Sequence, residues 1–474
     1  MKIYNTLSHQ KEEFKPIKDG EVLMYACGIT ASGDAHVGHA YQSIIFDMIS
    51  KYLRYRGYNV KYVRNYTDVD DKIIAKAQEL NQDPMSYAEH IMEKTDKELA
   101  ELGSDKPTVQ SRATQSIPNM IQFIQTLIDK GFAYATPEGN VYYKVSKFPA
   151  YGKLSRINWN ENRDGVRKEV EPGKIDDKDF ALWKAAKPGE ISWDTPWGKG
   201  RPGWHIECST MAMQYLGPTI DIHGGGRDLV FPHHENEIAQ SEALTGQQFS
   251  NYWMHNGLLK VNGQKMSKSL NNGILLADLL KEYKSDVIRF ALLRTLYRSD
   301  INITDDLFPE AEKHLYRFYQ TFAKIATMPV AGQADVTQKY IDQMHTDFIE
   351  AMDDDFNTSA VFAKLFGWMD FLFQESTKKN SPYILANIVA TLKEMFAVFG
   401  IFQKDPDEFI GFVRNKYLEK SGITRDEIMN KIQERAEYKK SKQFDLADNV
   451  RSELLQKHIA LQDTPAGTVW DVEL

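Results

Sequence analysis

Four side chains with metal-ligating chemistry stand out in the sequence: Cys27, Cys208, His233 and Glu237. His233 and Glu237 lie four residues apart in a stretch of helix-forming composition, which places both on one helical face. Two thiolates, an imidazole and a carboxylate make a plausible zinc-binding set. The spacing is not that of a Cys-x-x-Cys motif. The residue types alone therefore leave two interpretations open, a metal site or two buried cysteines near a surface His–Glu pair.

Two further histidines, His36 and His39, follow the apolar run EVLMYACGIT at residues 21–30. Such a run is typical of a strand in a parallel sheet, and the helical pattern up to Gly57 and the next strand pattern complete a βαβ unit. Ligands bind at the carboxyl ends of such strands. Because a helix N-terminus favours negative charge, two imidazoles there could complete a phosphate site. The alternative is a turn capped by a histidine.

Glycines and lysines supply two more candidate ligand contacts. The pattern TIDIHGGGRDLVF predicts a strand and a glycine-rich turn at residues 224–226, where the backbone could approach a ligand closely. A plain tight turn is the alternative, since no GxGxxG or P-loop pattern is present. The segment KMSKS (residues 265–269) follows a predicted hairpin at Val261–Gly263. Lys265 and Lys268 could neutralise charge on a polyphosphate, unless the segment is only a solvated surface loop.

The elements that must position these residues belong to a chain of 474 residues, which is too long for a single core. The composition, 26% charged and 42% hydrophobic, is ordinary for a soluble globular protein, and no run approaches the length of a membrane span. The N-terminal residues resemble neither a secretory signal nor a transit peptide. Two cysteines argue against a disulfide framework and suit a reducing cytosol. A net charge of −8 argues against non-specific coating of nucleic acid but leaves local RNA binding open.

Beyond the first βαβ unit, the pattern changes character several times. We expect a helical stretch at 85–135, an insertion of short strands and turns at 136–200, an almost wholly helical region at 305–400, and a linker near 404–408. Two helices and a small β-like tail follow the linker, and the first helix ends in a lysine cluster. The segment DDDFNTS (residues 353–359) could suggest a metal site, but a helix start capped by Asn or Thr is the preferred interpretation.

Taken together, HVGH at 36–39 and KMSKS at 265–269 resemble the two ATP motifs of class I aminoacyl-tRNA synthetases, in the same order and placement. Val37 stands where isoleucine is usual in that family. The segments MYACGIT, YVRNYTDVDDKI, GWHIECS, DIHGGGRDLVFPHHENEIAQ and NYWMHNG narrow the match, because they are similar to cysteinyl-tRNA synthetases. The C-terminal segment from Arg435 to Trp470 resembles the end of that family as well. The resemblance covers nearly the whole chain.

The resemblance implies an architecture and its boundaries. We expect an α/β Rossmann-like nucleotide-binding catalytic domain with an insertion, followed by an α-helical bundle and a small mixed α/β C-terminal domain. The implied parts are the two halves of the catalytic domain (1–115 and 201–250), a connective insertion (116–200), a KMSKS-bearing region that contacts the tRNA stem (251–304), a helical bundle (305–403) and an anticodon-binding domain (404–474).

The resemblance also implies residue roles. One zinc ion per chain would be held by Cys27, Cys208, His233 and Glu237, with the substrate thiolate as an extra ligand. His36, His39, Lys265 and Lys268 would act in catalysis and, with Gly38, Gly224 and Gly225, bind ATP. Gly28, Thr67, Trp204 and Asp228 would form the amino-acid pocket. Mg²⁺ is expected on the phosphates, and Asp68, Asp70 and Asp71 are outside candidates for its ligands or simply cap the next helix.

The implied activity is that of a cysteine–tRNA ligase, which activates L-cysteine with ATP and transfers it to tRNA(Cys). An ordinary pocket separates cysteine from serine poorly, whereas zinc prefers a thiolate to a hydroxyl. We expect a cytoplasmic monomer without a membrane segment, and Lys439, Lys440, Lys442 and Arg451 as contacts to the tRNA backbone. Two rivals remain, a paralogue that joins cysteine to an amino sugar and a catalytically inactive RNA- or zinc-binding module.

Overall fold

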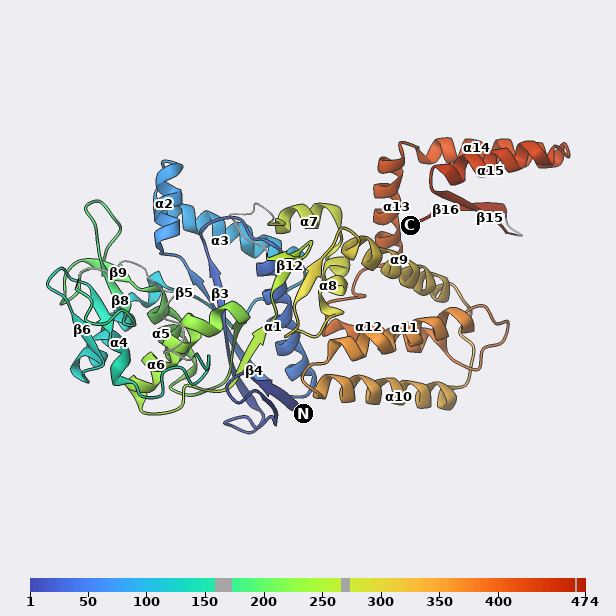
Figure 1. The fold of residues 1–474 in the computed structure, drawn as a ribbon. Coiled ribbons are helices and arrows are strands. Elements are labelled where there is room, and N and C mark those ends of the chain that lie inside the picture. Colours follow the sequence, from blue (N-terminus) through green and yellow to red (C-terminus); the bar gives the residue numbers. More distant parts are fainter. Residues whose placement is uncertain (158–172, 266–272, 465–466) are drawn as a thin grey trace. The chain divides into compact units, whose positions relative to one another are not determined.

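Five parallel strands form the central sheet of the computed structural model, which describes residues 1–157, 173–265, 273–464 and 467–474 (Figure 1). The sheet lies in the first of two compact units, which comprises Met1–Leu307, Asp342–Phe366 and Met395–Gly400. Its strand order is β11 (Ser250–Asn256), β10 (Ile220–Gly226), β3 (Glu21–Thr30), β4 (Asn59–Thr67) and β5 (Val109–Arg112). The apolar run that predicted a buried parallel strand is β3, so this expectation is confirmed.

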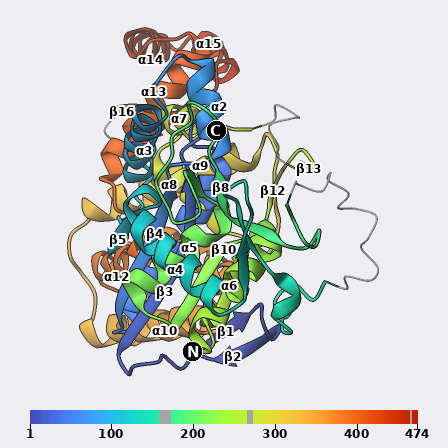
Figure 2. The ribbon, with the colours of Figure 1, turned by 90° about the vertical axis from the view of Figure 1, so that its left-hand side faces the viewer.

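Helices cover both faces of the sheet. Helix α1 (Val37–Tyr55) packs on β4 and β10, whereas α5 (Trp204–Leu216) packs on β3 and β4. Helices α4 (Ile117–Asp129) and α6 (Glu235–Thr245) contact α5, and Figure 2 shows these three helices in front of the strands. The expected class, an α/β Rossmann-like domain, is confirmed by this arrangement.

The glycine run of the sequence belongs to strand β10 and does not form the turn that we expected. A Cβ atom on Gly224 would lie 2.1 Å from the ring of Phe46 in α1, and one on Gly225 would lie 2.8 Å from the ring of His234. Successive strand residues face opposite sides of a sheet, so the two glycines admit neighbours from both faces. Close packing, and not a change of chain direction, explains the glycines.

The order of the strands creates a switch point between β3 and β10. From β3 the chain proceeds to β4 and β5 on one side, and the later strands β10 and β11 lie on the other side. In open α/β sheets, ligands bind outside the carboxyl ends of the strands at such a point. The carboxyl ends of β3 and β10 are therefore the expected location of the site.

An antiparallel sheet forms the insertion. Its strands are β6 (Ala133–Ala135), β7 (Val141–Tyr143), β8 (Phe180–Ala185) and β9 (Gly200–Pro202), paired in that order. The expected uninterrupted helical stretch at 85–135 is wrong in part, because β5 and β6 interrupt it between α3 (Pro84–Glu101) and α4. The four residues of β5 carry no apolar period of their own, and pairing with β4 fixes them as a strand.

The remaining elements of the first unit connect the sheet to helices. They are β1 (Lys2–Asn5), β2 (Gln10–Glu13), α2 (Asp71–Glu79), β12 (Leu259–Val261), β13 (Gln264–Lys265), α7 (Leu276–Glu282), α8 (Ser285–Leu293), β14 (Ile301–Ile303), and parts of α10 (Ala334–Asp353), α11 (Thr358–Glu375) and α12 (Leu385–Ala397). Strands β12 and β13 form the predicted hairpin. Helix α11 begins at Thr358, and the Asn357 side chain accepts from the Ala360 N–H at 3.1 Å, which confirms the predicted capped helix start.

The second unit comprises Phe308–Ile341, Gly367–Glu394 and Ile401–Leu474. Its further elements are α9 (Leu307–Ala326), α13 (Pro406–Ser421), α14 (Arg425–Lys440), α15 (Phe444–Gln456) and the hairpin of β15 (Ile459–Thr464) and β16 (Gly467–Val472). The linker expected near 404–408 is instead the start of α13, where Asp405 caps the helix and Pro406 is its first residue.

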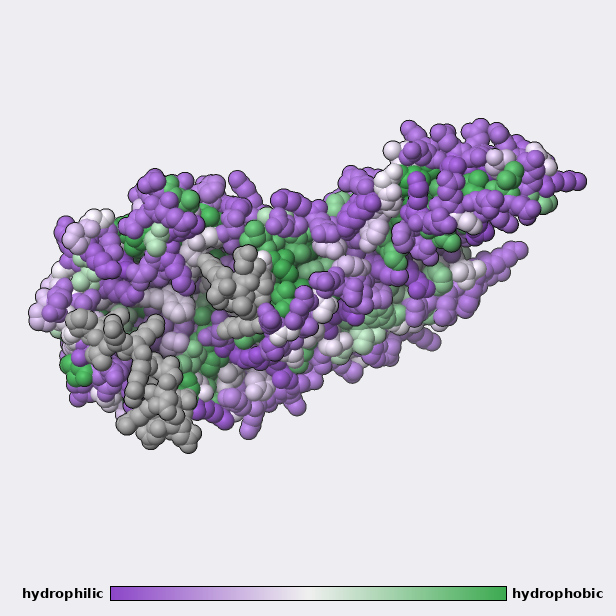
Figure 3. Space-filling model, turned by 45° about the horizontal axis from the view of Figure 1, so that its top comes forward, coloured by the Kyte–Doolittle hydropathy of each residue, from purple (hydrophilic) through white to green (hydrophobic). Residues whose placement is uncertain are grey.

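In the face shown in Figure 3, hydrophobic residues form separate patches on a mostly hydrophilic surface. No helix among the described residues is both long and apolar enough to span a lipid bilayer.

A buried ion pair ties together segments distant in the sequence. The Arg289 guanidinium on α8 is fully buried and donates to the Asp47 carboxylate on α1 at 2.6 Å and to the Phe399 carbonyl at 2.5 Å. A Cβ atom on Gly400 would lie 2.7 Å from the Arg289 Nε atom, so glycine leaves room for the guanidinium. The pair therefore anchors α8 and the segment Met395–Gly400 to the helix that carries the histidine motif.

Replacing Asp47 with Ala leaves the Arg289 guanidinium buried without its carboxylate. We expect the free energy of unfolding of the first unit to fall by about 3–5 kcal/mol. Asp34→Ala is the control, because Asp34 pairs with Lys94 at the surface and its loss costs about 1 kcal/mol or less. Urea unfolding of the two variants measures the difference, and equal shifts in both would contradict the role given to the buried pair.

Candidate metal centre

The four predicted ligands lie together at the carboxyl end of β3. Cys27 comes from β3, Cys208 from the first half of α5, His233 from the turn before α6, and Glu237 from the first turn of α6. One ligand atom from each residue lies within 4.8 Å of all the others. All four side chains are buried, with at most 3% of each residue exposed. The chain thus folds back to assemble a set that is scattered over 210 residues of sequence.

The spacing of the ligand atoms fits a tetrahedral zinc ion. With zinc–sulfur bonds of about 2.3 Å and zinc–oxygen or zinc–nitrogen bonds of about 2.0 Å, tetrahedral neighbours lie roughly 3.8 Å (S–S), 3.5 Å (S–O) and 3.3 Å (N–O) apart. The observed separations are 3.6 Å between the two sulfurs, 3.4 Å from Cys27 Sγ to Glu237 Oε1 and 3.1 Å from that oxygen to His233 Nε2. These edges bound a space of the size that one such ion occupies.

Local structure separates Glu237 from its acidic neighbour Glu235. The Glu235 carboxylate accepts three backbone N–H groups of the insertion, from Gly152 at 2.8 Å, Leu154 at 3.1 Å and Ser155 at 2.8 Å. Glu235 therefore anchors the insertion to α6. Glu237, two residues later, points toward the cysteines. The first turn of a helix favours both carboxylates, because its N–H groups carry partial positive charge.

Further histidines orient the ligands. The Nδ1 atom of His205 lies 2.9 Å from His233 Nδ1, which leaves His233 Nε2 directed at Glu237. His223 Nε2 lies 2.8 Å from the second oxygen of Glu237, and His234 Nε2 lies 3.2 Å from Cys27 Sγ. Such contacts fix the tautomer and orientation of metal ligands.

The sequence patterns assign no role to these orienting histidines. Beyond His205 and His223, the Nδ1 atom of His234 lies 2.8 Å from His255 Nε2. His223 and His255 occur at alternate-face positions of apolar strands, IDIH and YWMH. A histidine in a buried strand needs a polar partner, and this was the available signal. The identity of each partner depends on strand order, which the sequence did not reveal.

Burial and mutual contacts shift the pKa values of the four side chains. Burial and the hydrogen bond to Cys208 raise the pKa of Cys27 well above its usual range. Burial also opposes ionisation of Cys208, but the hydrogen bond from Cys27 and the neighbouring His233 lower the pKa of Cys208 to about 6. The pKa of His233 is raised to about 10, against the effect of burial, mainly by Glu237. A divalent cation would stabilise both thiolates and displace the proton of His233.

The first motif caps the helix that follows β3. The His36 side chain accepts from the Gly38 N–H at 3.1 Å, and the His39 side chain accepts from the His36 N–H at 3.4 Å, in a reciprocal capping box. The two imidazoles stack with ring centroids 3.7 Å apart. No acidic residue lies in the first turn of this helix of 19 residues, so no carboxylate of its own neutralises the positive end of the helix dipole.

The second motif begins in the described part of the chain. Lys265 belongs to β13, and Lys268 lies outside the described residues. Where the description resumes, the Ile274 carbonyl accepts from the Val37 N–H at 2.8 Å, and the Leu276 N–H donates to the Ala35 carbonyl at 2.9 Å. The segment that follows KMSKS is therefore held against the N-terminal end of α1.

Three of the four residues expected in the amino-acid pocket contact the metal-ligand segments. Gly28 follows Cys27, and a Cβ atom there would lie 1.6 Å from the Asn65 carbonyl oxygen, so only glycine fits. The Thr67 hydroxyl donates to the Glu207 carboxylate at 2.6 Å, next to Cys208. The Trp204 ring is 39% exposed and stacks on His233 with centroids 4.2 Å apart. Asp228 lies on the exposed turn Arg227–Leu229 after β10.

The three aspartates considered for Mg²⁺ have structural partners. The Asp68 carboxylate accepts from the Thr114 N–H at 2.9 Å and from its hydroxyl at 2.5 Å. Asp70 caps α2 through the Lys72 N–H at 2.9 Å. Asp71 forms ion pairs with Lys184 and Arg201. The helix-capping alternative therefore holds for Asp70, whereas Asp68 and Asp71 bind residues outside α2.

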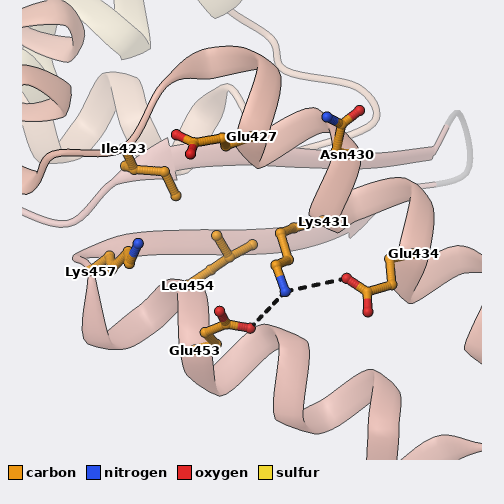
Figure 4. A pocket seen from close by; sticks show the side chains of 8 residues that line it. All are labelled: Ile423, Glu427, Asn430, Lys431, Glu434, Glu453, Leu454 and Lys457. Atoms are coloured by element: carbon orange, nitrogen blue, oxygen red, sulfur yellow. Dashed lines mark hydrogen bonds and ion pairs between the residues drawn. The ribbon is translucent and has the colours of Figure 1, made fainter.

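A separate cavity of about 310 Å³ lies between α14 and α15 in the second unit (Figure 4). Lys431 on α14 bridges to α15 through Glu453 at 3.0 Å, and it also pairs with Glu434 on its own helix at 3.3 Å. The cavity is lined by Ile423, Glu427, Asn430, Lys431, Glu434, Glu453, Leu454 and Lys457. Three carboxylates against two ammonium groups make it a poor receptor for a phosphate.

Comparison with known proteins adds an independent line of evidence. The family described as "tRNA synthetases class I (C) catalytic domain" matches residues 13–313, and the DALR domain matches residues 347–403. The chain is 46% identical over 487 residues to a cysteine–tRNA ligase of Geobacter metallireducens, and 44% identical over 489 residues to one of Thermodesulfovibrio yellowstonii. Both alignments cover 100% of each chain.

Solved structures show the same fold at much lower identity. A Mycobacterium tuberculosis methionyl-tRNA synthetase in complex with methionyl-adenylate superposes with a TM-score of 0.57 at 14% identity, over 86% of this chain and 94% of that one. The LeuRS of Agrobacterium radiobacter K84, in a ternary complex with tRNA, gives a TM-score of 0.59 at 12% identity, over 83% and 87% of the two chains.

Zinc affinity should rise with pH. In the metal-free protein at about pH 7, Cys27 and His233 hold protons, whereas Cys208 and Glu237 have largely lost theirs. Binding must expel the two protons, so the affinity should increase roughly 100-fold from about pH 7 to about pH 8. Competition with a chelator at the two pH values, and proton release measured by calorimetry in two buffers, test this. An affinity independent of pH would contradict the assignment of these ligands.

Replacing His205 with Ala removes the group that fixes the orientation of the His233 ring. We expect the zinc affinity to fall about 10–100-fold, because ring orientation is lost while all four ligands remain. The control is Thr210→Ala on the same helix, since the buried Thr210 hydroxyl has no hydrogen-bond partner among the described residues. Chelator competition compares both variants with the wild type. Equal affinities in all three proteins would remove His205 from the site.

Proposed function

Since the chain belongs to the class I cysteine–tRNA ligases, we propose that a zinc ion held by Cys27, Cys208, His233 and Glu237 selects its amino-acid substrate. The enzyme uses ATP to join L-cysteine to tRNA(Cys). The buried tetrahedral spacing of the four ligand atoms is the observation that carries the proposal. One zinc ion per chain is expected.

Selection has to distinguish a thiol from a hydroxyl. A pocket that relies on shape separates such near-isosteres by only about 10²-fold. Bound zinc supplies a soft Lewis acid that prefers a thiolate and lowers the pKa of the thiol. The protein's part is to present four ligands in a dry site and to hold the substrate beside them. We assign the latter role to Gly28, Thr67, Trp204 and Asp228, the first three of which contact the ligand segments.

Activation proceeds by attack of the cysteine carboxylate on the α-phosphate of ATP, with release of pyrophosphate. We propose that His36, His39, Lys265 and Lys268 stabilise the charge that develops on the phosphates. The N-terminal end of α1 adds the partial positive charge of its N–H groups. Gly38, Gly224 and Gly225 complete the ATP site, and Mg²⁺ accompanies the phosphates.

The second step transfers cysteine to RNA. The terminal ribose hydroxyl of tRNA attacks the adenylate carbonyl, and AMP departs without a covalent enzyme intermediate. We propose that residues 404–474 bind the anticodon region, with Lys439, Lys440, Lys442 and Arg451 near the backbone. Lys439 also pairs with Asp463 at 2.7 Å, so Lys440 and Lys442 at the exposed end of α14 are the more accessible pair.

We also propose the compartment and the oligomeric state of the enzyme. A reducing cytosol suits a protein whose two cysteines remain unpaired thiols at a metal site. We expect a monomer. A ligase that joins cysteine to an amino sugar shares the adenylation chemistry, and transfer to tRNA distinguishes the two activities.

The decisive experiment measures cysteine-dependent exchange of labelled pyrophosphate into ATP. We expect exchange with cysteine, and a kcat/KM for serine lower by at least about 10⁴-fold. Zinc removal, or Cys208→Ala, should abolish most of this preference or the activity itself, whereas Thr210→Ala should retain both. A zinc-free protein that still prefers cysteine undiminished would refute the role of the metal. Failure to charge a tRNA with a GCA anticodon would refute the ligase assignment.

A further inference from the structure

Three consecutive aspartates, residues 353–355, end α10 and begin the turn to α11, and the tRNA ligase reaction does not explain their function. Asp353 accepts from the Tyr52 hydroxyl at 2.7 Å, and Asp354 pairs with Lys11 at 2.7 Å. Asp355 is fully buried. Each carboxylate therefore has its own partner, and among the described residues no metal-binding group includes any of them.

Asp355 is held in an unusual conformation. Its φ angle is +66° and that of Phe356 is +51°, in the left-handed region that residues other than glycine rarely occupy. Three donors surround the carboxylate: the Tyr4 N–H at 2.8 Å, the Tyr297 hydroxyl at 3.0 Å and the Arg298 Nε at 2.9 Å. A strained backbone persists only when its surroundings fix it, and here the strain places a buried negative charge against residues 297–298.

Residues Tyr297–Asp300 form a segment that two parts of the candidate active site contact. The Tyr297 carbonyl accepts from the Tyr41 hydroxyl at 2.9 Å and from the Gly257 N–H at 2.8 Å. Tyr41 lies on α1, two residues after His39. Gly257 lies two residues before β12, and a Cβ atom there would lie 2.0 Å from the Ser299 carbonyl oxygen. The segment is thus packed between the helix of the first motif and the strand that leads to the second.

The same segment fixes the position of the β12–β13 hairpin. Asp300 accepts from the Leu258 N–H at 3.0 Å and pairs with Lys260 at 3.3 Å. Strand β14, which follows directly, pairs with β12 in parallel from Leu259 to Val261. The hairpin then continues to Lys265. Contacts therefore run without interruption from Asp355 to the strand that carries the first lysine of the KMSKS segment.

From these contacts we propose that Asp355 is a positioning residue for amino-acid activation: it holds residues 297–300 so that the β12–β13 hairpin and the N-terminal end of α1 are aligned for the transfer. This inference rests on the proposed function, which places charge-stabilising groups on both elements. Asp355 bonds to Lys2, Tyr4, Tyr297 and Arg298, and none of these is a candidate metal ligand or a proposed substrate-binding residue. Misplacement of reacting groups by about 1 Å can lower a rate on the order of 10²-fold, so a distant anchor can control catalysis.

The test replaces Asp355 with Asn, which keeps the shape of the side chain but removes its charge and half of its acceptor capacity. We expect kcat for cysteine-dependent pyrophosphate exchange to fall about 10–100-fold. The KM values for cysteine and ATP should change less than about threefold, because interactions made only in the transition state are lost. Zinc content should stay at one ion per chain. The matched control is Asp354→Asn, whose single ion pair is half exposed, and its kcat should stay near that of the wild type.

A milder variant covers the case in which Asp355→Asn does not fold. Tyr297→Phe removes only the hydroxyl that donates to Asp355, and it should lower kcat in the same manner but less. If the two residues act through one contact, the double variant should show less than the product of the two single effects. Titration of active sites by the burst of adenylate formation separates slower turnover from a smaller active fraction.

The outcomes distinguish the possible failures. A wild type without exchange activity refutes the proposed function itself. With exchange intact, a normal kcat in both Asp355→Asn and Tyr297→Phe refutes the positioning role. A loss confined to the active fraction does so as well, because it would mark Asp355 as a residue for stability alone. A rise in KM without a fall in kcat also refutes the role, because it would mark a loss of substrate binding and not of alignment in the transition state.

Discussion

Two sulfurs and a carboxylate oxygen lie buried together at the end of β3, and a cation among them would relieve the repulsion that arises when all three groups ionise. Much of the first unit is arranged around this constraint. Strand β3 supplies one cysteine at the switch point, and α5 and α6 bring the other ligands to it from one face. The surrounding imidazoles direct each ligand atom inward, and apolar neighbours such as Trp253 exclude solvent. The candidate metal cluster and the packing of the first unit therefore depend on the same elements, β3, α5 and α6.

The first motif follows the same strand directly. Helix α1 begins after β3 ends, so His36, the first of the proposed catalytic groups, lies nine residues after Cys27, a candidate metal ligand. The KMSKS segment belongs to a later part of the chain. Backbone hydrogen bonds hold β13, where the segment begins, against β12, and they hold Ile274, which follows the segment, against Val37. Short connections position the first motif, whereas the second depends on contacts between distant segments.

Local pattern was sufficient for some features and insufficient for others. The βαβ unit, the β12–β13 hairpin, the insertion and the helix start at Thr358 could be predicted, because each has its own period or capping residue. The residue types make Cys27, Cys208, His233 and Glu237 a plausible zinc-binding set, and the resemblance to cysteinyl-tRNA synthetases implies that all four are ligands. The prediction of a turn at the glycines of β10 is wrong, because their small size serves the close approach of Phe46 and His234, which the sequence does not show. The sequence at the start of α13 is also typical of a linker, because Asp and Pro occur both at helix N-termini and in segments that end a helix. Asp355 was assigned only to a helix start, since its partners lie up to 351 residues away.

The separation of 351 residues between Tyr4 and Asp355 has a consequence for folding during synthesis on the ribosome. Strand β1 bonds to Asp355 through Tyr4 and, by the Asp355 N–H, through Lys2. At about 5–20 residues per second, these partners emerge roughly 20–70 s after the strand itself. Before then β1 can contact β2 and, once it is synthesised, β11, but the turn that binds Lys2 and Tyr4 is missing and the hairpin of β12 and β13 lacks its anchor. The four candidate metal ligands, all synthesised by residue 237, can therefore come together before the proposed activation site is in register.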